Sequence, residues 1–202
     1  MIDWSLYIDY GVKKMYKKNE ILFRQGSNMD GFYYLEDGKV AVTILRSDGF
    51  ERMIDIVFPG SLIGEQMIYG TPSFTTTTMM KNSTLYYFSK DTFNKLAEIN
   101  PQISIEFSNS FIQKIRFLAN IHAVLNAPAE VQVAHFLIVL RNKKRDGKIN
   151  LTQTEISNYI GKSRVTIWKI LKKWDEDGLV AMNKRGIIIK DEKAIRSKIV
   201  LL

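Results

Sequence analysis

The sequence lacks several residue types that common functional sites require. None of its 202 residues is cysteine, which excludes disulfides, iron–sulfur clusters with cysteine ligands and thiol redox sensing. Its only histidines are His122 and His135, so we expect neither a conventional zinc site nor another metal site. No apolar run approaches the roughly 20 residues of a membrane-spanning helix, and the first residues do not resemble a signal peptide. We therefore expect a cytoplasmic protein that binds no cofactor and no membrane.

Patterns that are typical of enzymes are missing as well. Residues 20–90 contain no histidine, so a barrel enzyme with a histidine-bound metal is not expected. Residues 60–64 include two glycines but lack the Lys-Ser or Lys-Thr pair of a phosphate-binding loop. We expect no enzymatic activity and assign no catalytic residue. Hydrophobic residues make up 46% of the chain, which is enough for packed cores in one or two domains.

Positive charge is concentrated at the C-terminal end of the chain. Residues 127–202 contain 16 of the 29 Lys and Arg residues but only 8 of the 21 Asp and Glu residues, whereas residues 1–126 carry no net charge. An excess of positive charge in one segment is typical of a domain that binds nucleic acid. On charge alone, the alternatives are a basic surface that serves only solubility and one that faces a membrane.

Short apolar runs separated by turn residues predict an antiparallel β-domain in the first half of the chain. Gly, Asp and Pro residues separate the runs, and Asp48-Gly49 is typical of a tight hairpin turn. This even spacing favours a barrel or a jelly roll. The runs lie at residues 21–23, 32–35, 40–45, 53–58 and 85–88.

Helical periodicity replaces this pattern after Asn100-Pro101, a pair that suits the start of a helix. Apolar residues also recur on a second face, at Ile105, Ile112 and Ala119. Because a helix that is apolar on two faces must bury both, we expect one face to pack on the β-domain and the other to form a dimer interface. The alternative is a helix buried within one monomer. The stripe predicted for the dimer interface, with its heptad spacing, consists of Phe107, Phe111, Ile115, Leu118, His122 and Leu125.

The most specific motif lies near the C-terminal end. Thr152 and Glu155 form the pattern of an N-terminal capping box. Gly161 stands where a turn between two helices needs a positive φ, and Ser163 suits the start of the second helix. With the β-hairpin expected over residues 179–189, these features predict a winged helix-turn-helix. An amphipathic helical hairpin with a basic outer face is the alternative.

The second helix of such a motif places its N-terminal residues in the major groove of DNA. We expect Arg164 to contact guanine or a phosphate, Val165 a thymine methyl group, and Lys169 a base or a phosphate. The hydroxyls of Ser163 and Thr166 suit phosphate contacts. These five residues are our predicted DNA-binding residues.

Motifs along nearly the whole chain resemble, in order and spacing, those of the cyclic-AMP receptor protein/fumarate–nitrate regulator family of bacterial transcription factors. The resemblance rests on Arg24-Gln25-Gly26, residues 33–40, residues 59–65, Asn100-Pro101 and residues 151–180. It implies a homodimer on double-stranded DNA, with half-sites about one DNA turn apart, and RNA polymerase as a candidate partner.

The same resemblance implies an α+β fold in three parts. Residues 1–99 would form a double-stranded β-helix, a jelly roll of the cyclic-nucleotide-binding type that senses an effector. Residues 100–126 would form a long dimerisation helix, and residues 127–202 a winged helix-turn-helix that binds DNA. The break at Asn126-Ala127-Pro128 fits the last of these boundaries.

The predicted effector pocket departs from that of the cyclic-AMP receptors, in which an Arg-Ser pair holds the cyclic phosphate. Alignment places Ser73 and Phe74 at those positions, and no arginine occurs between Arg52 and Arg116. Burying a phosphate without a cationic partner is costly, so we expect an effector other than cyclic AMP, apolar or aromatic. Alternatives are a cyclic nucleotide after all and a regulator without an effector. The predicted pocket residues are Gly64, Glu65, Ser73, Phe74, Thr75 and Leu118.

The recognition helix departs from the cyclic-AMP receptors too. Those proteins use Arg-Glu at its start and a second arginine five positions after the first, where this chain has Arg164-Val165 and Lys169. Loss of the acid removes an acceptor for cytosine, and valine favours a thymine methyl group. We therefore expect an A/T-rich half-site related to TTGAT or TTAAT and not to TGTGA. Trp168 shares this face, although it can also be interpreted as partly packed.

Overall fold

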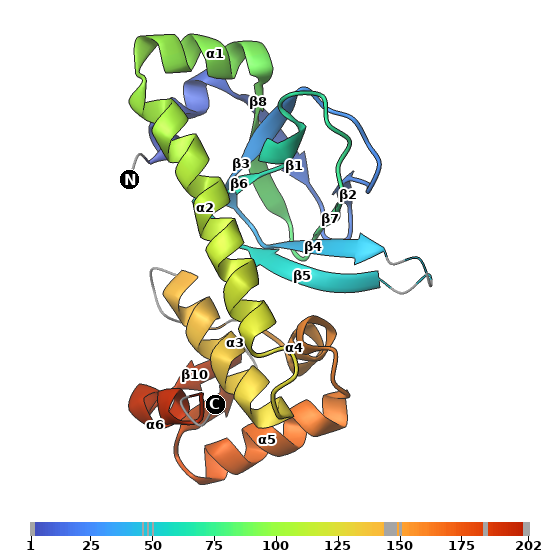
Figure 1. The fold of residues 1–202 in the computed structure, drawn as a ribbon, viewed down its shortest axis with the longest axis vertical. Helices are drawn as coiled ribbons and strands as arrows, with labels where there is room; N and C mark the ends of the chain where they lie inside the picture. Colours follow the sequence, from blue (N-terminus) through green and yellow to red (C-terminus); the bar gives the residue numbers. More distant parts are fainter. Residues whose placement is uncertain are drawn as a thin grey trace. The chain divides into compact units, whose positions relative to one another are not determined.

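The structure is a computed structural model that describes residues 3–45, 47, 49, 51–143, 149, 151–183 and 186–199 (Figure 1). The chain forms two compact units, Met1–Lys114 and Ile115–Leu202. Asp48 of the predicted hairpin turn, the basic segment 144–148 and residues 184–185 of the wing lie outside the described residues. Among the helices that the structure describes, none is long and apolar enough to cross a membrane.

The first unit contains two four-stranded sheets, with strand orders β1-β8-β3-β6 and β2-β7-β4-β5. All of the strand pairs within them are antiparallel, which confirms the predicted jelly roll. The elements are η1 Trp4–Tyr10, β1 Val12–Tyr16, β2 Ile21–Phe23, β3 Gly31–Asp37, β4 Val40–Leu45, β5 Glu51–Val57, β6 Leu62–Ile63, η2 Glu65–Met67, β7 Thr76–Met79 and β8 Ser83–Ser89.

Strand β3 shows why the predicted apolar runs are continuous rather than alternating. Tyr33 and Leu35 join the core between the two sheets, where they meet residues from the other strands. Phe32 and Tyr34 point to the opposite face and join a second core. A strand that is covered on both faces needs apolar residues at every position.

The second core lies on the outer face of the sheet that contains β3. It is built from η1, from α1 (Lys90–Ile99) and from the first turns of α2 (Gln102–Ala123). The Ser89 hydroxyl accepts a hydrogen bond from the backbone N–H of Thr92 and so caps α1. The ring of Phe107 lies 5.0 Å from that of Phe32 and 4.6 Å from that of Phe93, which anchors α2 to the roll.

The described part of the second unit contains four helices and a β-hairpin besides the end of α2. Trp174 is buried at its centre, and its indole N–H donates to Glu130 at 3.0 Å. Hydrogen bonds from Lys198 and Trp174 hold the pKa of Glu130 below its usual range, so they favour the ionised form of this carboxyl group. The winged helix-turn-helix is confirmed by the elements α3 Ala129–Lys143, α4 Gln153–Ile160, α5 Arg164–Glu176, β9 Val180–Asn183, β10 Gly186–Ile189 and α6 Glu192–Ser197.

Candidate DNA-binding face and effector pocket

The local chemistry of the helix-turn-helix follows the sequence prediction. The side chain of Thr152 accepts from the backbone N–H of Glu155, and the carboxylate of Glu155 accepts from the backbone N–H of Thr152, which confirms the capping box. Gly161 ends α4 with φ of 74°, a left-handed conformation that glycine adopts at little cost. Ser163 caps α5 by accepting from the backbone N–H of Thr166 at 3.1 Å. These bonds fix where α5 begins.

The turn between α4 and α5 is held by one further hydrogen bond, which the sequence did not indicate. The hydroxyl of Ser157 donates to the backbone carbonyl of Lys162 at 2.6 Å. A small residue at position 157 thus allows α4 and α5 to approach and also holds the turn that joins them. Ile167 and Leu171 of α5 are fully buried behind it, so the opposite side of α5 faces outward.

The outward side of α5 carries the predicted DNA-binding residues. Ser163, Arg164 and Lys169 are exposed, Thr166 is half-buried, and Val165 is 62% exposed. The Ser163 and Thr166 hydroxyls lie 2.9 Å apart at the N-terminus of the helix. Because the N-terminus of a helix attracts anions, the beginning of α5 is a candidate contact for a phosphate.

Trp168 lies at the edge of the same face, three residues before the buried Leu171. Its side chain is 42% exposed, and the ammonium group of Lys172 lies 5.0 Å from its ring centre. The residue is therefore neither a core residue nor a freely moving surface side chain. Its place one turn after Arg164 makes it part of the candidate DNA-binding face.

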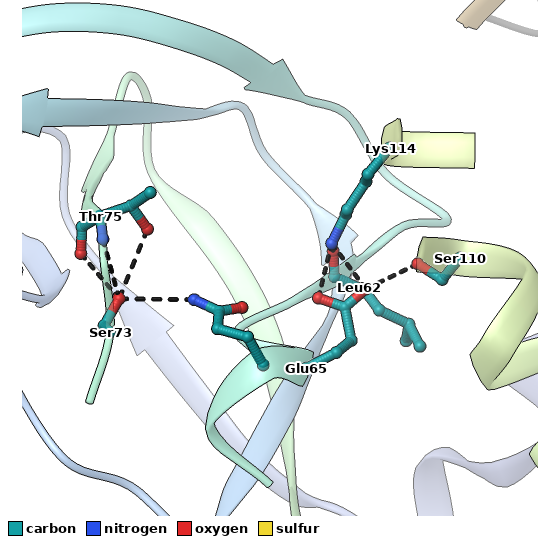
Figure 2. A network of polar contacts seen from close by, with 7 residues as sticks. Leu62, Glu65, Ser73, Thr75, Ser110 and Lys114 are labelled. Carbon is teal, nitrogen blue, oxygen red and sulfur yellow. Dashed lines mark hydrogen bonds and ion pairs between the residues drawn. The ribbon is translucent and has the colours of Figure 1, made fainter. Parts of the chain in front are cut away.

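Among the predicted pocket residues, Glu65 shows the most consequential contacts. Its carboxylate is 1% exposed and accepts from Lys114 Nζ at 2.5 and 2.6 Å and from Ser110 Oγ at 2.6 Å. Lys114 also donates to the carbonyl of Leu62 at 3.0 Å. Figure 2 shows Glu65 directed toward Lys114 and Ser110 of α2, on a different side from Ser73. The carboxylate of Glu65 is thus already bonded to side chains of its own chain.

Ser73 and Thr75 form a second polar group on the other side of η2 (Figure 2). Ser73 Oγ donates to the carbonyl of Thr75 at 2.8 Å and accepts from the backbone N–H of Thr75 at 3.2 Å. Gln66 Nε2 donates to Ser73 Oγ at 3.4 Å. The neighbouring residues Glu65 and Gln66 of η2 therefore make hydrogen bonds to two different parts of the first unit. Phe74, between these residues, is exposed. Leu118 is also exposed and belongs to the second unit.

The core between the two sheets is built from aliphatic side chains, methionines and aromatic rings. A methyl group at Gly64 would lie 3.0 Å from Met67 Cε and 3.3 Å from Met29 Cε, so methionines fill the space beside it. Burial raises the pKa of Tyr33 far above its usual value, and the phenol stays neutral. Thr77 Oγ1 is fully buried and finds no hydrogen-bond partner within the described part of the chain.

The stripe predicted for the dimer interface divides into two parts. Phe107, which is 6% exposed, packs in the core of the first unit, and Phe111 is half-buried against it. The rest of the stripe is exposed in the single chain, with Ile115 at 64%. The second predicted stripe is exposed as well. The exposed large apolar residues of α2 are Ile105, Ile112, Ile115 and Leu118, and Leu125 is exposed just after the helix ends.

Sequence reasoning missed Lys114 as the partner of Glu65. It lies 49 positions from Glu65, and such long-range pairs leave no local pattern. One signal was available, because Lys114 and Ser110 stand one turn apart on the side of α2 that carries Phe107. A lysine on the core-facing side of a helix needs a buried acid. No group of three or more acidic or histidine side chains suited to a metal occurs among the described residues.

Comparisons with known proteins agree with this architecture. Residues 13–100 match the family model of the cyclic nucleotide-binding domain, and residues 131–197 match that of the Crp-like helix-turn-helix domain. The HTH-type transcriptional regulator Cmr of Mycobacterium tuberculosis is 22% identical over 187 residues, which cover 92% of this chain and 75% of the relative. The cAMP-activated global transcriptional regulator CRP of Salmonella typhimurium is 24% identical over 183 residues, which cover 86% of this chain and 87% of the relative.

A solved structure shows the same fold. FixK2 from Bradyrhizobium japonicum superposes with a TM-score of 0.81 at 18% sequence identity, and the match covers 93% of this chain and 96% of FixK2.

Proposed function

Because the chain belongs to the CRP/FNR family of transcriptional regulators, we propose its DNA target and its type of effector. Regulators of this family bind DNA as dimers and carry an effector-binding domain. It binds an A/T-rich inverted repeat as a homodimer. A small apolar or aromatic effector within the β-roll, other than cyclic AMP, controls this binding. Its relatives are regulators and not enzymes, so the proposal concerns binding alone.

The exposed face of α5 is the observation that supports the DNA target. Arg164 and Lys169 supply cationic donors there, and Val165 supplies an exposed apolar surface between them. No acidic side chain stands at the first turn of α5, so cytosine N4 finds no carboxylate acceptor on that turn. A thymine methyl group is the base feature that an exposed valine suits.

Selection from randomised duplex DNA tests this target. We expect an inverted repeat with A/T-rich half-sites related to TTGAT or TTAAT, with centres about 10 base pairs apart, one turn of the double helix. Selection should be done at fixed salt, because the phosphate contacts of Lys and Arg make affinity salt-dependent. A consensus of the TGTGA type would contradict the proposed reading by Val165.

The engaged carboxylate of Glu65 is the observation that supports a different effector. Lys114 is the cation nearest to this acid, and Glu65 neutralises its charge, so Lys114 is not free to balance a phosphate. The Salmonella relative is activated by cAMP, but this chain has Ser73 and Phe74 where the cyclic-AMP receptors hold their phosphate. The neutral interior around Tyr33 is costly for an anion. Thr77 offers one unpartnered hydroxyl to a polar group on an otherwise apolar molecule.

Calorimetry with cyclic AMP and cyclic GMP tests the exclusion of nucleotides. We expect no heat of binding at ligand concentrations up to about 100 μM, which would saturate a site with a dissociation constant of about 1 μM. The control is a thermal-shift screen with phenols and aromatic acids, of which a binder should raise the melting temperature. Micromolar binding of either nucleotide would overturn the pocket argument.

A regulator without an effector is a second candidate, and one observation favours it. Met29 and Met67 already occupy the space beside Gly64, so flexible side chains of the roll itself fill this part of its interior. This candidate predicts that purified protein binds the selected DNA fully without any added compound. Under the main proposal, the aromatic compound that raises the melting temperature also changes DNA affinity.

A possible route of control runs through η2 within the first unit. Gln66 bonds Ser73 beside the roll interior, while Glu65 bonds Lys114 and Ser110 on α2. Because the two residues are neighbours in one short turn, a ligand that moves Gln66 also shifts Glu65. We propose that this turn carries an effector signal from the roll to α2, which also bears the exposed stripe of the dimer interface.

A further inference from the structure

We propose that Trp168 is a specificity-determining residue of this regulator and that its exposed indole packs on the methyl group of a thymine in each half-site. The inference rests on the proposed function, because it assumes that α5 enters the major groove. It goes beyond that function by assigning to Trp168 a thymine different from the one expected to contact Val165.

The position of Trp168 on α5 is the first support. It follows Val165 by three residues and Arg164 by four, and residues at these spacings share one side of a helix. The buried Leu171 follows Trp168 by three residues, so Trp168 stands at the edge of the outward face, between Val165 and the buried side of α5. If Arg164 and Val165 contact the major groove, a side chain at position 168 is close enough to contact DNA as well.

The state of the side chain is the second support. With 42% of its surface exposed, a residue as large as tryptophan leaves a broad apolar area in water, and Val165 beside it is 62% exposed. The Lys172 ammonium group, 5.0 Å from the ring centre, restrains the indole and is itself near Glu176 at 3.7 Å. A restrained aromatic ring loses little conformational freedom when it binds a partner.

The chemistry of the major groove identifies the partner of this apolar area. The thymine 5-methyl group is the apolar feature that the base edges present there, whereas the other groups are hydrogen-bond donors and acceptors. The indole of Trp168 therefore buries its exposed apolar area best against the methyl group of a thymine that lies near the bases contacted by Arg164 and Lys169. The apolar pair of Trp168 and Val165 would then read two thymines, which agrees with an A/T-rich half-site.

Replacement of thymine by deoxyuridine isolates this contact, because it removes only the methyl group and keeps the hydrogen bonds of the base pair. Each thymine of the selected DNA is replaced in turn, in both half-sites together, and the dissociation constant is measured by fluorescence anisotropy at fixed salt. For the unaltered protein we expect about a fourfold loss per methyl contact, or about 16-fold for two half-sites, at two positions.

Two variants assign the positions. Trp168→Ala should bind more weakly and lose the sensitivity to deoxyuridine at one position, while it keeps the sensitivity at the other. Trp168→Phe keeps an apolar ring without the indole N–H and should keep both sensitivities. Val165→Ala is the matched control, because it should remove sensitivity only at the other position.

Several results would overturn the proposal. One is an unaltered protein that binds thymine and deoxyuridine DNA equally well at every position. Another is a Trp168→Ala protein that loses affinity equally for both DNAs, which would indicate a phosphate contact. Either leaves the proposed function intact, since selection would still return an inverted repeat. If selection returns no consensus sequence at all, the proposed function fails together with this inference.

Discussion

Replacing Ile115 by glutamate should convert the regulator into a monomer that no longer holds its inverted repeat. Ile115 is 64% exposed in the single chain, so the new carboxylate stays in water and the fold of the monomer tolerates it. In a dimer through α2, two isoleucines lose their burial and two carboxylates approach each other. Loss of the two buried side chains alone costs at least about 3 kcal/mol, which raises the dissociation constant of the dimer by about 100-fold.

Sedimentation or light scattering across a dilution series measures this change, and anisotropy on the selected DNA measures its consequence. Affinity for the full repeat should fall toward that for a single half-site, because the second contact is no longer intramolecular. Gln113→Glu is the matched control, since Gln113 is exposed and lies about half a turn from Ile115 on the same helix. An Ile115→Glu protein that stays dimeric would exclude this part of α2 from the interface.

Replacing Arg164 by alanine should remove most of the discrimination between the selected DNA and unrelated DNA. A good base contact by arginine contributes about 1–3 kcal/mol of discrimination, and a symmetric dimer makes it twice, so affinity for the repeat should fall at least about 30-fold. The fold should not suffer. Arg164 begins α5, where a positive charge is unfavourable beside the helix N-terminus, and its removal relieves that repulsion.

Lys193→Ala is the control for Arg164→Ala, because it removes the same charge from an exposed position on α6 of the same unit. The control should weaken binding slightly and to the same extent for all sequences, as expected for long-range attraction to phosphates. Repeating the selection with Arg164→Ala should return a consensus with less information at one position. Equal losses for the two variants would mean that Arg164 contacts phosphate and reads no base.

The parts of the fold that sequence predicted well are those specified by neighbouring residues. The capping box of Thr152 and Glu155, the left-handed Gly161 and the cap at Ser163 each depend on a few consecutive residues, and all are present. The runs that became β2 and β4 were predicted at the bounds that the structure shows. In these segments, local preference and final structure agree.

The elements that sequence missed lack such local signals. Strand β1 is an edge strand whose residues Val12 to Met15 are all exposed, so neither alternation nor an apolar run marks it. Strand β7 is threonine-rich and reads as polar, although Thr77 and Met79 face the interior. Helix α1 was not predicted as a separate helix, since the pair Asn100-Pro101 predicted a helix that starts only after it.

The candidate sites divide in the same way. The residues of the candidate DNA-binding face follow from the position of one helix, so sequence was enough to predict that they lie together at the start of α5. The ion pair of Glu65 with Lys114 depends on how α2 packs on the roll, and no spacing within the sequence reveals it. Phe107 shows the converse, because a heptad stripe tells which side of a helix is apolar but not whether its own chain or a partner covers it.

A hydroxyl-radical footprint of the dimer on its selected DNA tests the central claim most directly. If two α5 helices enter successive major grooves, the protected stretches form a symmetric pair on one side of the duplex, with centres about one turn, or 10 base pairs, apart. Their protection should be retained at a salt concentration that releases unrelated DNA. Even protection along any DNA, lost at the same salt for selected and unrelated sequences, would contradict the claim that this chain is a sequence-specific regulator.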